Sequence, residues 1–342
     1  MFKSNRIARI GLTAGVWVSL FASLSGLGYA TERWKNIGPE GGSIASLVMD
    51  PSNSSILYSG TSYGGIFKST NGASGWKNVN SGLPNAVYNG TVPALAIHSS
   101  NPNTIYAGIA GGGVYKSLNG GEEWSPINSG ISDLTVNSLV IAPSNANILY
   151  AGTENISGTG GVLKSTDGGN TWIQVNASLT YVYALAVDPG NPNVVYAGTF
   201  NSGIYKSTNG GTNWGAVNTG LTSTSIYALA INPTNSNIVY AGTYTGTVFK
   251  TTNGGTSWTA TGSGPTGTNC IVFHPTDSNT LFAASNGGIY KSSNGGTNWT
   301  GINSGIPASQ IVRTIIITPA SPNILYAGMN WAGVFKTTDG GG

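Results

Sequence analysis

The amino-acid sequence predicts an all-β protein, a seven-bladed β-propeller with four antiparallel strands in each blade. Three observations support this prediction. A glycine-rich turn leading to a tryptophan recurs every 41 to 48 residues, and short apolar runs bounded by Gly, Pro, Asn and Asp fill each repeat. Charged residues make up only 7% of a chain that is 39% hydrophobic, so a core can form beneath a surface of amides and hydroxyls. A period of this length with four strands is typical of propeller blades.

The strands of one repeat follow one another in a fixed order. An alternating apolar run ends in a proline turn, as in residues 185–189, and a Tyr-Ala-Gly strand follows, as in residues 194–198. The third strand has the form of residues 203–207, and the fourth begins at the tryptophan. Gly, Pro, Asn and Asp bound these runs, as strand ends require.

The recurring turn, which we call the box turn, places Asn or Asp two residues after a Ser or Thr and just before glycine. Such side chains hydrogen-bond nearby backbone N–H groups, and the glycines permit positive φ. The tryptophan is expected to be an apolar plug with one N–H to satisfy. Because five of the seven box turns carry Asn, a structural hydrogen-bonding role is predicted for all of them. The predicted structural residues are Asn71, Asn119, Asp167, Asn209, Asn253, Asn294 and Asp339, with Trp34, Trp76, Trp124, Trp172, Trp214, Trp258 and Trp299.

The last box turn, which begins at Thr337, has no tryptophan after it. Residues 32–37 look like a fourth strand around Trp34, with no box turn before them, 42 residues ahead of Trp76. We therefore expect the strand around Trp34 to complete the last blade beside residues 333–338. This closure would leave no free sheet edge.

The first thirty residues predict a secretory leader. Three basic residues precede an uncharged apolar stretch, and Gly28-Tyr29-Ala30 has the small-x-small form of a cleavage site. We expect residues 1–30 to be a signal peptide and residues 31–342 to form one propeller domain that is secreted, periplasmic or on the cell surface. An uncleaved membrane anchor is the alternative.

The charge of the rest of the chain argues against a nucleic-acid partner. The leader holds three of the 14 basic residues and none of the 11 acidic ones, so the remainder is close to neutral. Phosphate binding needs an excess of cations. Cys270 is the single cysteine, which excludes an intrachain disulfide and a lipid-bearing cysteine after the leader. We expect a monomer with no cofactor, no metal and no membrane span in the mature chain.

The Ser-x-Asp/Asn-x-Gly-x-x-Trp copies resemble the Asp-box, or bacterial neuraminidase, repeat over residues 32–342. The resemblance implies a seven-bladed propeller similar to those of sialidases, xyloglucan-specific hydrolases, sortilin-type receptors and photosystem II assembly factors. A sialidase needs an arginine triad, and only Arg33 and Arg313 follow the leader. The xyloglucan hydrolases resemble this chain in the first blade, but they carry a catalytic acid at the position that Ser62 occupies here. The arginine-rich patch of the assembly factors is also missing.

Few acidic residues are candidates for catalysis. Most lie in box turns or in the turns between the first two strands, which leaves Glu40, Asp133 and Glu154 on loops of the opposite rim. Glycoside hydrolysis needs two carboxylates at a defined separation. His98 and His274 share the turn slot of acidic residues in other blades, so we interpret them as turn residues and not as metal ligands.

Seven lysines recur once per blade just before the box turn. They could form a basic ring for an anionic polymer, or lie on outer strands as solvated side chains with packed stems. The second interpretation is the simpler one.

The rim opposite the box turns is the predicted binding surface. Its loops carry aromatic side chains beside amides, a combination that suits both sugar rings and protein interfaces. The predicted binding residues are Tyr63, Tyr88, Tyr181, Phe200, Tyr227, Tyr244, Asn330 and Trp331. The sequence thus favours a binding or scaffolding propeller with a protein or glycan ligand over an enzyme. A divergent glycoside hydrolase acting on a polysaccharide is the alternative.

Overall fold

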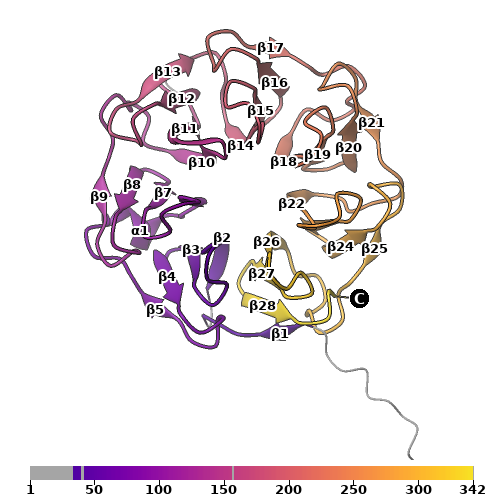
Figure 1. Ribbon diagram of the computed structural model, residues 1–342, viewed down its shortest axis with the longest axis horizontal. Coiled ribbons are helices and arrows are strands. Elements are labelled where there is room, and N and C mark those ends of the chain that lie inside the picture. Colours follow the sequence, from indigo (N-terminus) through magenta and orange to yellow (C-terminus); the bar gives the residue numbers. More distant parts are fainter. Residues whose placement is uncertain (1–33, 40–41, 156–157, 342) are drawn as a thin grey trace, which may run out of the picture. The chain divides into compact units, whose positions relative to one another are not determined.

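The computed structural model describes residues 34–39, 42–155 and 158–341, and the predicted signal peptide lies outside these residues. Seven four-stranded antiparallel sheets are arranged around a central axis (Figure 1). The predicted seven-bladed propeller is confirmed. Among the described residues, no helix is long and apolar enough to cross a membrane.

Each blade is a four-stranded meander that runs from the axis outward. The innermost strands are β2 (Ser43–Met49), β6 (Ala94–Ile97), β10 (Val136–Ala142), β14 (Val182–Val187), β18 (Ile226–Ile231), β22 (Thr268–Phe273) and β26 (Val312–Ile317). The second strands are β3 (Leu57–Ser62), β7 (Ile105–Ile109), β11 (Asn145–Thr153), β15 (Val195–Thr199), β19 (Val239–Thr243), β23 (Leu281–Ser285) and β27 (Leu325–Met329).

The outer half of each blade holds the box turn. The third strands are β4 (Ile66–Ser69), β8 (Gly113–Ser117), β12 (Val162–Ser165), β16 (Gly203–Ser207), β20 (Val248–Thr251), β24 (Gly288–Ser292) and β28 (Gly333–Thr337). The fourth strands are β5 (Lys77–Asn78), β9 (Ser125–Pro126), β13 (Ile173–Asn176), β17 (Gly215–Ala216), β21 (Thr259–Ala260), β25 (Thr300–Gly301) and β1 (Lys35–Asn36). One short helix, α1 (Ala86–Asn89), lies between β5 and β6.

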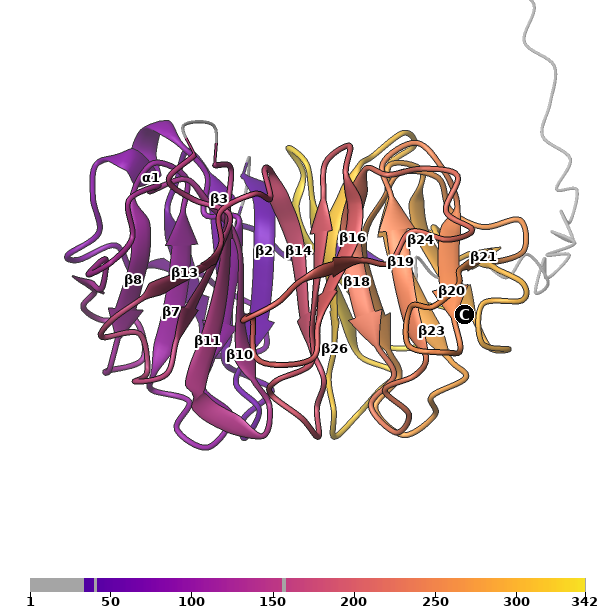
Figure 2. The same cartoon turned by 90° about the horizontal axis from the view of Figure 1, so that it is seen from above.

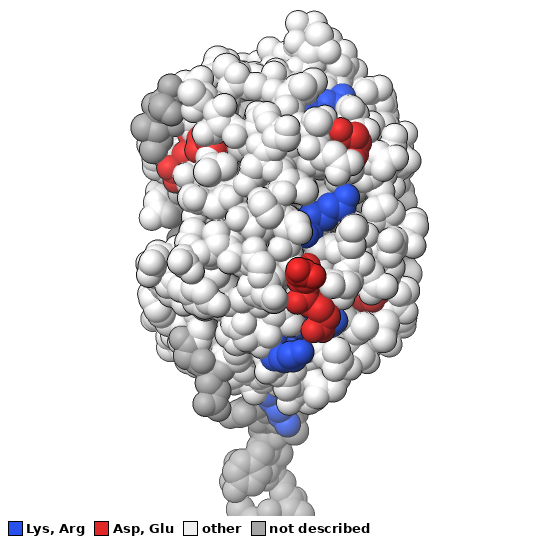
Figure 3. Space-filling view, turned by 90° about the vertical axis from the view of Figure 1, so that its left-hand side faces the viewer, with Lys and Arg blue, Asp and Glu red and all other residues white. Residues whose placement is uncertain are grey.

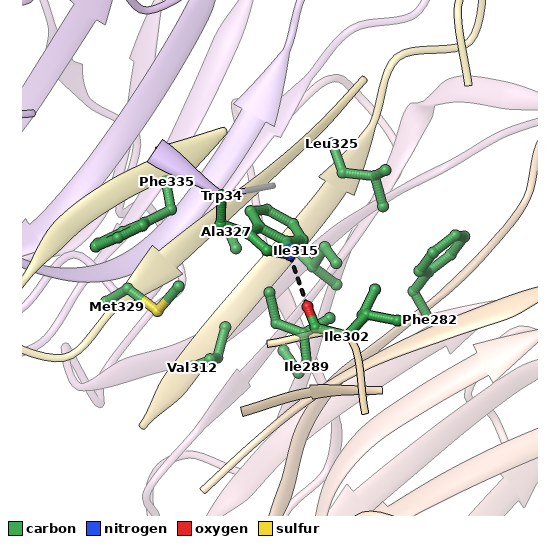
Figure 4. Packing of buried hydrophobic residues seen from close by; sticks show 11 residues of the cluster. Trp34, Phe282, Ile289, Ile302, Val312, Ile315, Leu325, Ala327, Met329 and Phe335 are labelled. Carbon is green, nitrogen blue, oxygen red and sulfur yellow. Dashed lines mark hydrogen bonds between the residues drawn. The ribbon is translucent and has the colours of Figure 1, made fainter. Parts of the chain in front are cut away.

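The last blade is closed by the N-terminal strand, as expected. Strand β1 pairs with β28 in the register Lys35 to Lys336. Trp34 is fully buried at this closure, and its Nε1–H donates to the carbonyl of Ile302 in the neighbouring blade at 2.7 Å. Figure 4 shows this hydrogen bond within the apolar cluster between the two blades. The core is therefore divided among the blade interfaces and does not surround a single centre.

Candidate functional site

The two faces of the ring are formed by different loops and turns. All seven innermost strands begin at one face, which we call the upper face, and end at the other, the lower face; the arrowheads of β2 and β18 point down in Figure 2. Loops from second to third strands and from one blade to the next lie on the upper face. Box turns and the turns between first and second strands lie on the lower face.

Five aromatic rings form one cluster on the upper face, which we call the five-ring cluster. Tyr183 and Tyr227 stack with centroids 4.9 Å apart, and Tyr244 stacks on Tyr227 at 5.1 Å. Phe200 meets Tyr227 edge-on at 6.2 Å, and Tyr181 lies 6.3 Å from Phe200. Four of these residues were predicted from the loops. Tyr183 was not predicted, although it occupies the same repeat slot in β14 as Tyr227 in β18, and this repeat slot is the signal that could have found it.

A second aromatic pair lies on the same face, where the first and last blades meet. The rings of Tyr63 and Trp331 are nearly parallel, at 16°, with centroids 6.4 Å apart. They are 59% and 64% exposed, and both residues have positive φ, at 67° and 66°. Holding non-glycine residues in this region costs on the order of 1–3 kcal/mol, and such strain concentrates at functional sites. Tyr88, on α1, is exposed without a ring contact to another described aromatic residue.

The upper mouth of the central channel lies between these two aromatic groups. A hollow of about 260 Å³ is lined there by Asn137, Tyr183, Tyr227, Asn269 and Arg313, together with Asn330 and six smaller side chains, three polar and three apolar: Ser43, Ser62, Thr91, Ile44, Ala45 and Pro93. Asn330 accepts a hydrogen bond from Ser43 at 2.6 Å, and Asn269 donates to Val312.

Two donors at this mouth have no partner among the described residues. Arg313 is exposed and forms neither an ion pair nor a hydrogen bond there, and the buried amide nitrogen of Asn137 has no acceptor. Burial, with smaller contributions from neighbouring groups, raises the pKa of Tyr183 to about 12, so its phenol stays protonated near neutral pH. A ligand group rich in acceptor oxygens would pair with the exposed guanidinium of Arg313.

Two of the three candidate acids lie together beside the five-ring cluster. Burial raises the pKa of Glu154, and the charge of Asp133 raises it further. Asp133 accepts hydrogen bonds from the backbone N–H groups of Asn155 at 2.6 Å and Thr135 at 3.0 Å, which fix its position beside Glu154. The third candidate, Glu40, lies outside the described residues.

The histidines lie on the lower face and close turns. The Nδ1 atom of His98 accepts from the backbone N–H groups of Ser100 and Asn101, as the carboxylate of Asp50 does in its own blade. Within the described part of the chain, no group of three potential ligands could hold a metal ion.

The periodic lysines do not form a free basic ring. Each lies over the ring of a Tyr or Phe of the adjacent second strand, 5.1 to 5.6 Å from its centroid. Six of them also donate to a glycine carbonyl of a box turn in the neighbouring blade, as Lys206 does to Gly254 at 2.8 Å. The side of the molecule in Figure 3 shows only small groups of charge on a mostly uncharged surface.

Comparisons with known proteins agree with the fold. A family model described as sortilin, neurotensin receptor 3, matches residues 202–306. A search of curated proteins found no match. Among solved structures, an ancestral GH74 enzyme is similar with a TM-score of 0.70 and 23% identity, over 90% of this chain and 46% of that chain.

Two structures of YCF48 are also similar. YCF48 from Cyanidioschyzon merolae has a TM-score of 0.66 and 13% identity, over 89% of this chain and 98% of that one. YCF48 bound to D1 peptide has a TM-score of 0.68 and 14% identity, over 89% and 96%. This chain spans about half the length of the GH74 enzymes it matches. At these identities the similarity establishes the fold alone.

Proposed function

We propose that this chain is a secreted or cell-surface binding propeller that holds a segment of a protein partner across its upper face. The observation that carries the proposal is the channel mouth, where the exposed Arg313 has no partner among the described residues and lies between two groups of aromatic rings. Tyr, Trp and Arg are the side chains that dominate binding energy at protein interfaces. Backbone carbonyls and an acidic side chain of a partner would supply acceptors for Arg313.

The arrangement favours a long ligand over a small one. Trp331 and Tyr63 come from the last and first blades, and Tyr244 comes from the fifth, so a ligand that contacts both aromatic groups must span blade six or the channel mouth. That a propeller of the same fold is described as bound to a peptide supports this mode of binding.

A displayed peptide library panned on the purified chain tests the proposal, with a glycan array in parallel. Selected peptides should bind at least tenfold more weakly to Trp331→Ala, Tyr244→Ala and Arg313→Gln, about 1.4 kcal/mol each. Leu118→Ala is the control, because Leu118 is 69% exposed but lies in a box turn on the lower face. Peptide binding that all three variants retain would refute the choice of face. Enrichment of glycans alone would replace the protein partner with a sugar.

Glu154 supports a second candidate function, that of a glycoside hydrolase acting on a polysaccharide. The raised pKa of Glu154 suits a general acid, Asp133 would be the second carboxyl, and the neighbouring tyrosines would provide a stacking surface. A polysaccharide panel should then show turnover that both Glu154→Gln and Asp133→Asn remove. Turnover that survives both substitutions would exclude this pair.

A further inference from the structure

The lower face holds a hollow that we call the lower pocket. Its volume is about 480 Å³, and it is lined by the ends of the innermost strands of blades one, two, six and seven. The apolar lining includes Val48, Met49, Ile97, Phe273, Ile316 and Ile317. Pockets that bind small molecules have this size and this mainly apolar lining.

The size of the side chain at one strand position varies around the ring. The position that pairs with Tyr58, Phe282 and Tyr326 of the second strands holds Val48, Val272 and Ile316 in blades one, six and seven. It holds Ala96 in blade two, Val140 in blade three, and Ala186 and Ala230 in blades four and five. Blades one, six and seven therefore supply large apolar side chains from this position to the lower pocket.

One carboxylate, that of Asp50, belongs to the lining. Asp50 is only 7% exposed. Its Oδ1 accepts hydrogen bonds from the N–H and hydroxyl of Ser52 and from the N–H of Asn53, while Oδ2 accepts none from a described residue. No described lysine, arginine or histidine forms an ion pair with it. A charge beside an apolar surface is costly unless it is paired.

The turn itself does not require this charge. Asn232 occupies the same slot in blade five, and its Oδ1 accepts the same three hydrogen bonds, from the N–H and hydroxyl of Thr234 and the N–H of Asn235. One acceptor oxygen is therefore enough to close the turn. The second oxygen of Asp50, together with its charge, remains available to the lower pocket.

We infer that the lower pocket is a binding site for a small amphipathic cation, whose apolar body contacts the strand ends while its ammonium group pairs with Asp50. Charge complementarity decides the ligand class, because the pocket offers one carboxylate in a lining that is apolar apart from Ser99. This site lies on the face opposite the proposed partner-binding surface, so the two inferences can fail independently.

Calorimetric titration with two probes of equal length, n-hexylammonium and n-hexanol, tests the inference on the whole chain. Hexylammonium should bind about tenfold more tightly than hexanol, and Asp50→Asn should reduce this preference to less than threefold. Asp188→Asn is the matched control, because Asp188 closes the equivalent turn in blade four and does not line the pocket. Equal binding of both probes to the unmodified chain, or a preference that survives Asp50→Asn, would overturn the inference.

A second substitution tests whether the apolar body lies in the pocket. Ile316→Ala introduces the residue that blades four and five carry at this slot. It should weaken both probes alike, by about three- to tenfold, with hexylammonium still preferred, and thermal unfolding checks that the variant is folded. Unchanged binding of both probes to a folded variant would place the ligand elsewhere, and no binding of either probe at millimolar concentration would dismiss the site.

Discussion

At the scale of single residues, the hydrogen bonds of the box turn explain why either Asp or Asn can occupy it. The hydroxyl of Ser207 donates to Asn209 at 3.0 Å, and the N–H of Asn213 donates to the same oxygen at 2.9 Å. In blade three, Ser165 and Thr171 make the equivalent contacts to Asp167. In both residues a single oxygen accepts these two hydrogen bonds, so the charge of Asp167 is not needed to form the turn, although its second oxygen also accepts from the Thr171 hydroxyl.

That charge nevertheless makes one turn sensitive to acid. Hydrogen bonds, first from the Thr171 hydroxyl and then from its N–H, lower the pKa of Asp167 to about 2. A carboxyl group whose pKa is lowered by folding raises the free energy of unfolding at pH values above its ordinary pKa of about 3.9. This contribution is lost as the pH falls toward 2. We predict that the free energy of unfolding of Asp167→Asn depends less on pH than that of the original chain, as measured by urea unfolding between pH 2 and 5. Asn can donate to the residue-171 hydroxyl instead, as Asn253 does to Ser257.

The comparison of the two proteins decides this prediction. Other carboxylates titrate in both, so only the difference between the original chain and Asp167→Asn is informative. A constant difference across this pH range would show that Asp167 keeps its ordinary pKa.

At the scale of the strands, the periodic lysines connect neighbouring blades. Lys206 lies over Tyr196, and both side chains donate to the carbonyl of Gly254 in the next blade. Lys291 lies over Phe282 in the same way, but its ammonium has no hydrogen bond to a described residue. The two lysines therefore share the ring contact and differ in the hydrogen bond.

We predict that Lys206→Met destabilises the protein by about 1–2 kcal/mol more than Lys291→Met. Hydrogen bonds to charged groups contribute about 1.5–3 kcal/mol, and only Lys206 makes one. The expected difference is smaller than this range because Tyr196 still donates to the carbonyl of Gly254. Methionine keeps the apolar stem in both variants. Chemical unfolding of the two variants gives the difference directly. Equal losses would mean that the contact with the aromatic ring accounts for the whole effect.

The sequence could predict the strands but not all of their lateral contacts. The repeat placed each strand, and the missing tryptophan after Thr337 predicted the closing role of Trp34. The carbonyl acceptors of the lysines belong to the next blade, and the sequence alone gives no angle between blades. Tyr183 and Asp50 show a second limit of prediction from the sequence. Each occupies a repeat slot that similar residues fill in other blades, and only the packing around the axis distinguishes Tyr183 and Asp50 from those residues.

At the scale of the whole molecule, a ring of sheets depends on the joint where its ends meet. Six blades are continuous segments, whereas the seventh combines β26 to β28 with β1 from the other end of the chain. Trp34 fixes this joint through its buried ring and its hydrogen bond to Ile302. Trp124 has an equivalent position inside a continuous blade, 2% exposed and bonded to Val79 at 2.9 Å.

This pair separates the cost of a cavity from the cost of opening the ring. Trp34→Ala and Trp124→Ala should each lose about 3–5 kcal/mol, the usual range for a buried tryptophan. Trp34→Ala should lose more, because releasing β1 also exposes the edge of β28 and removes a constraint between the two ends of the propeller. Hydrogen exchange measures this directly, since protection in β28 should fall in Trp34→Ala and persist in Trp124→Ala. If the two variants lose the same stability and keep the same protection in β28, the joint behaves as any other blade interface, and the ring is held closed by packing distributed over all seven interfaces.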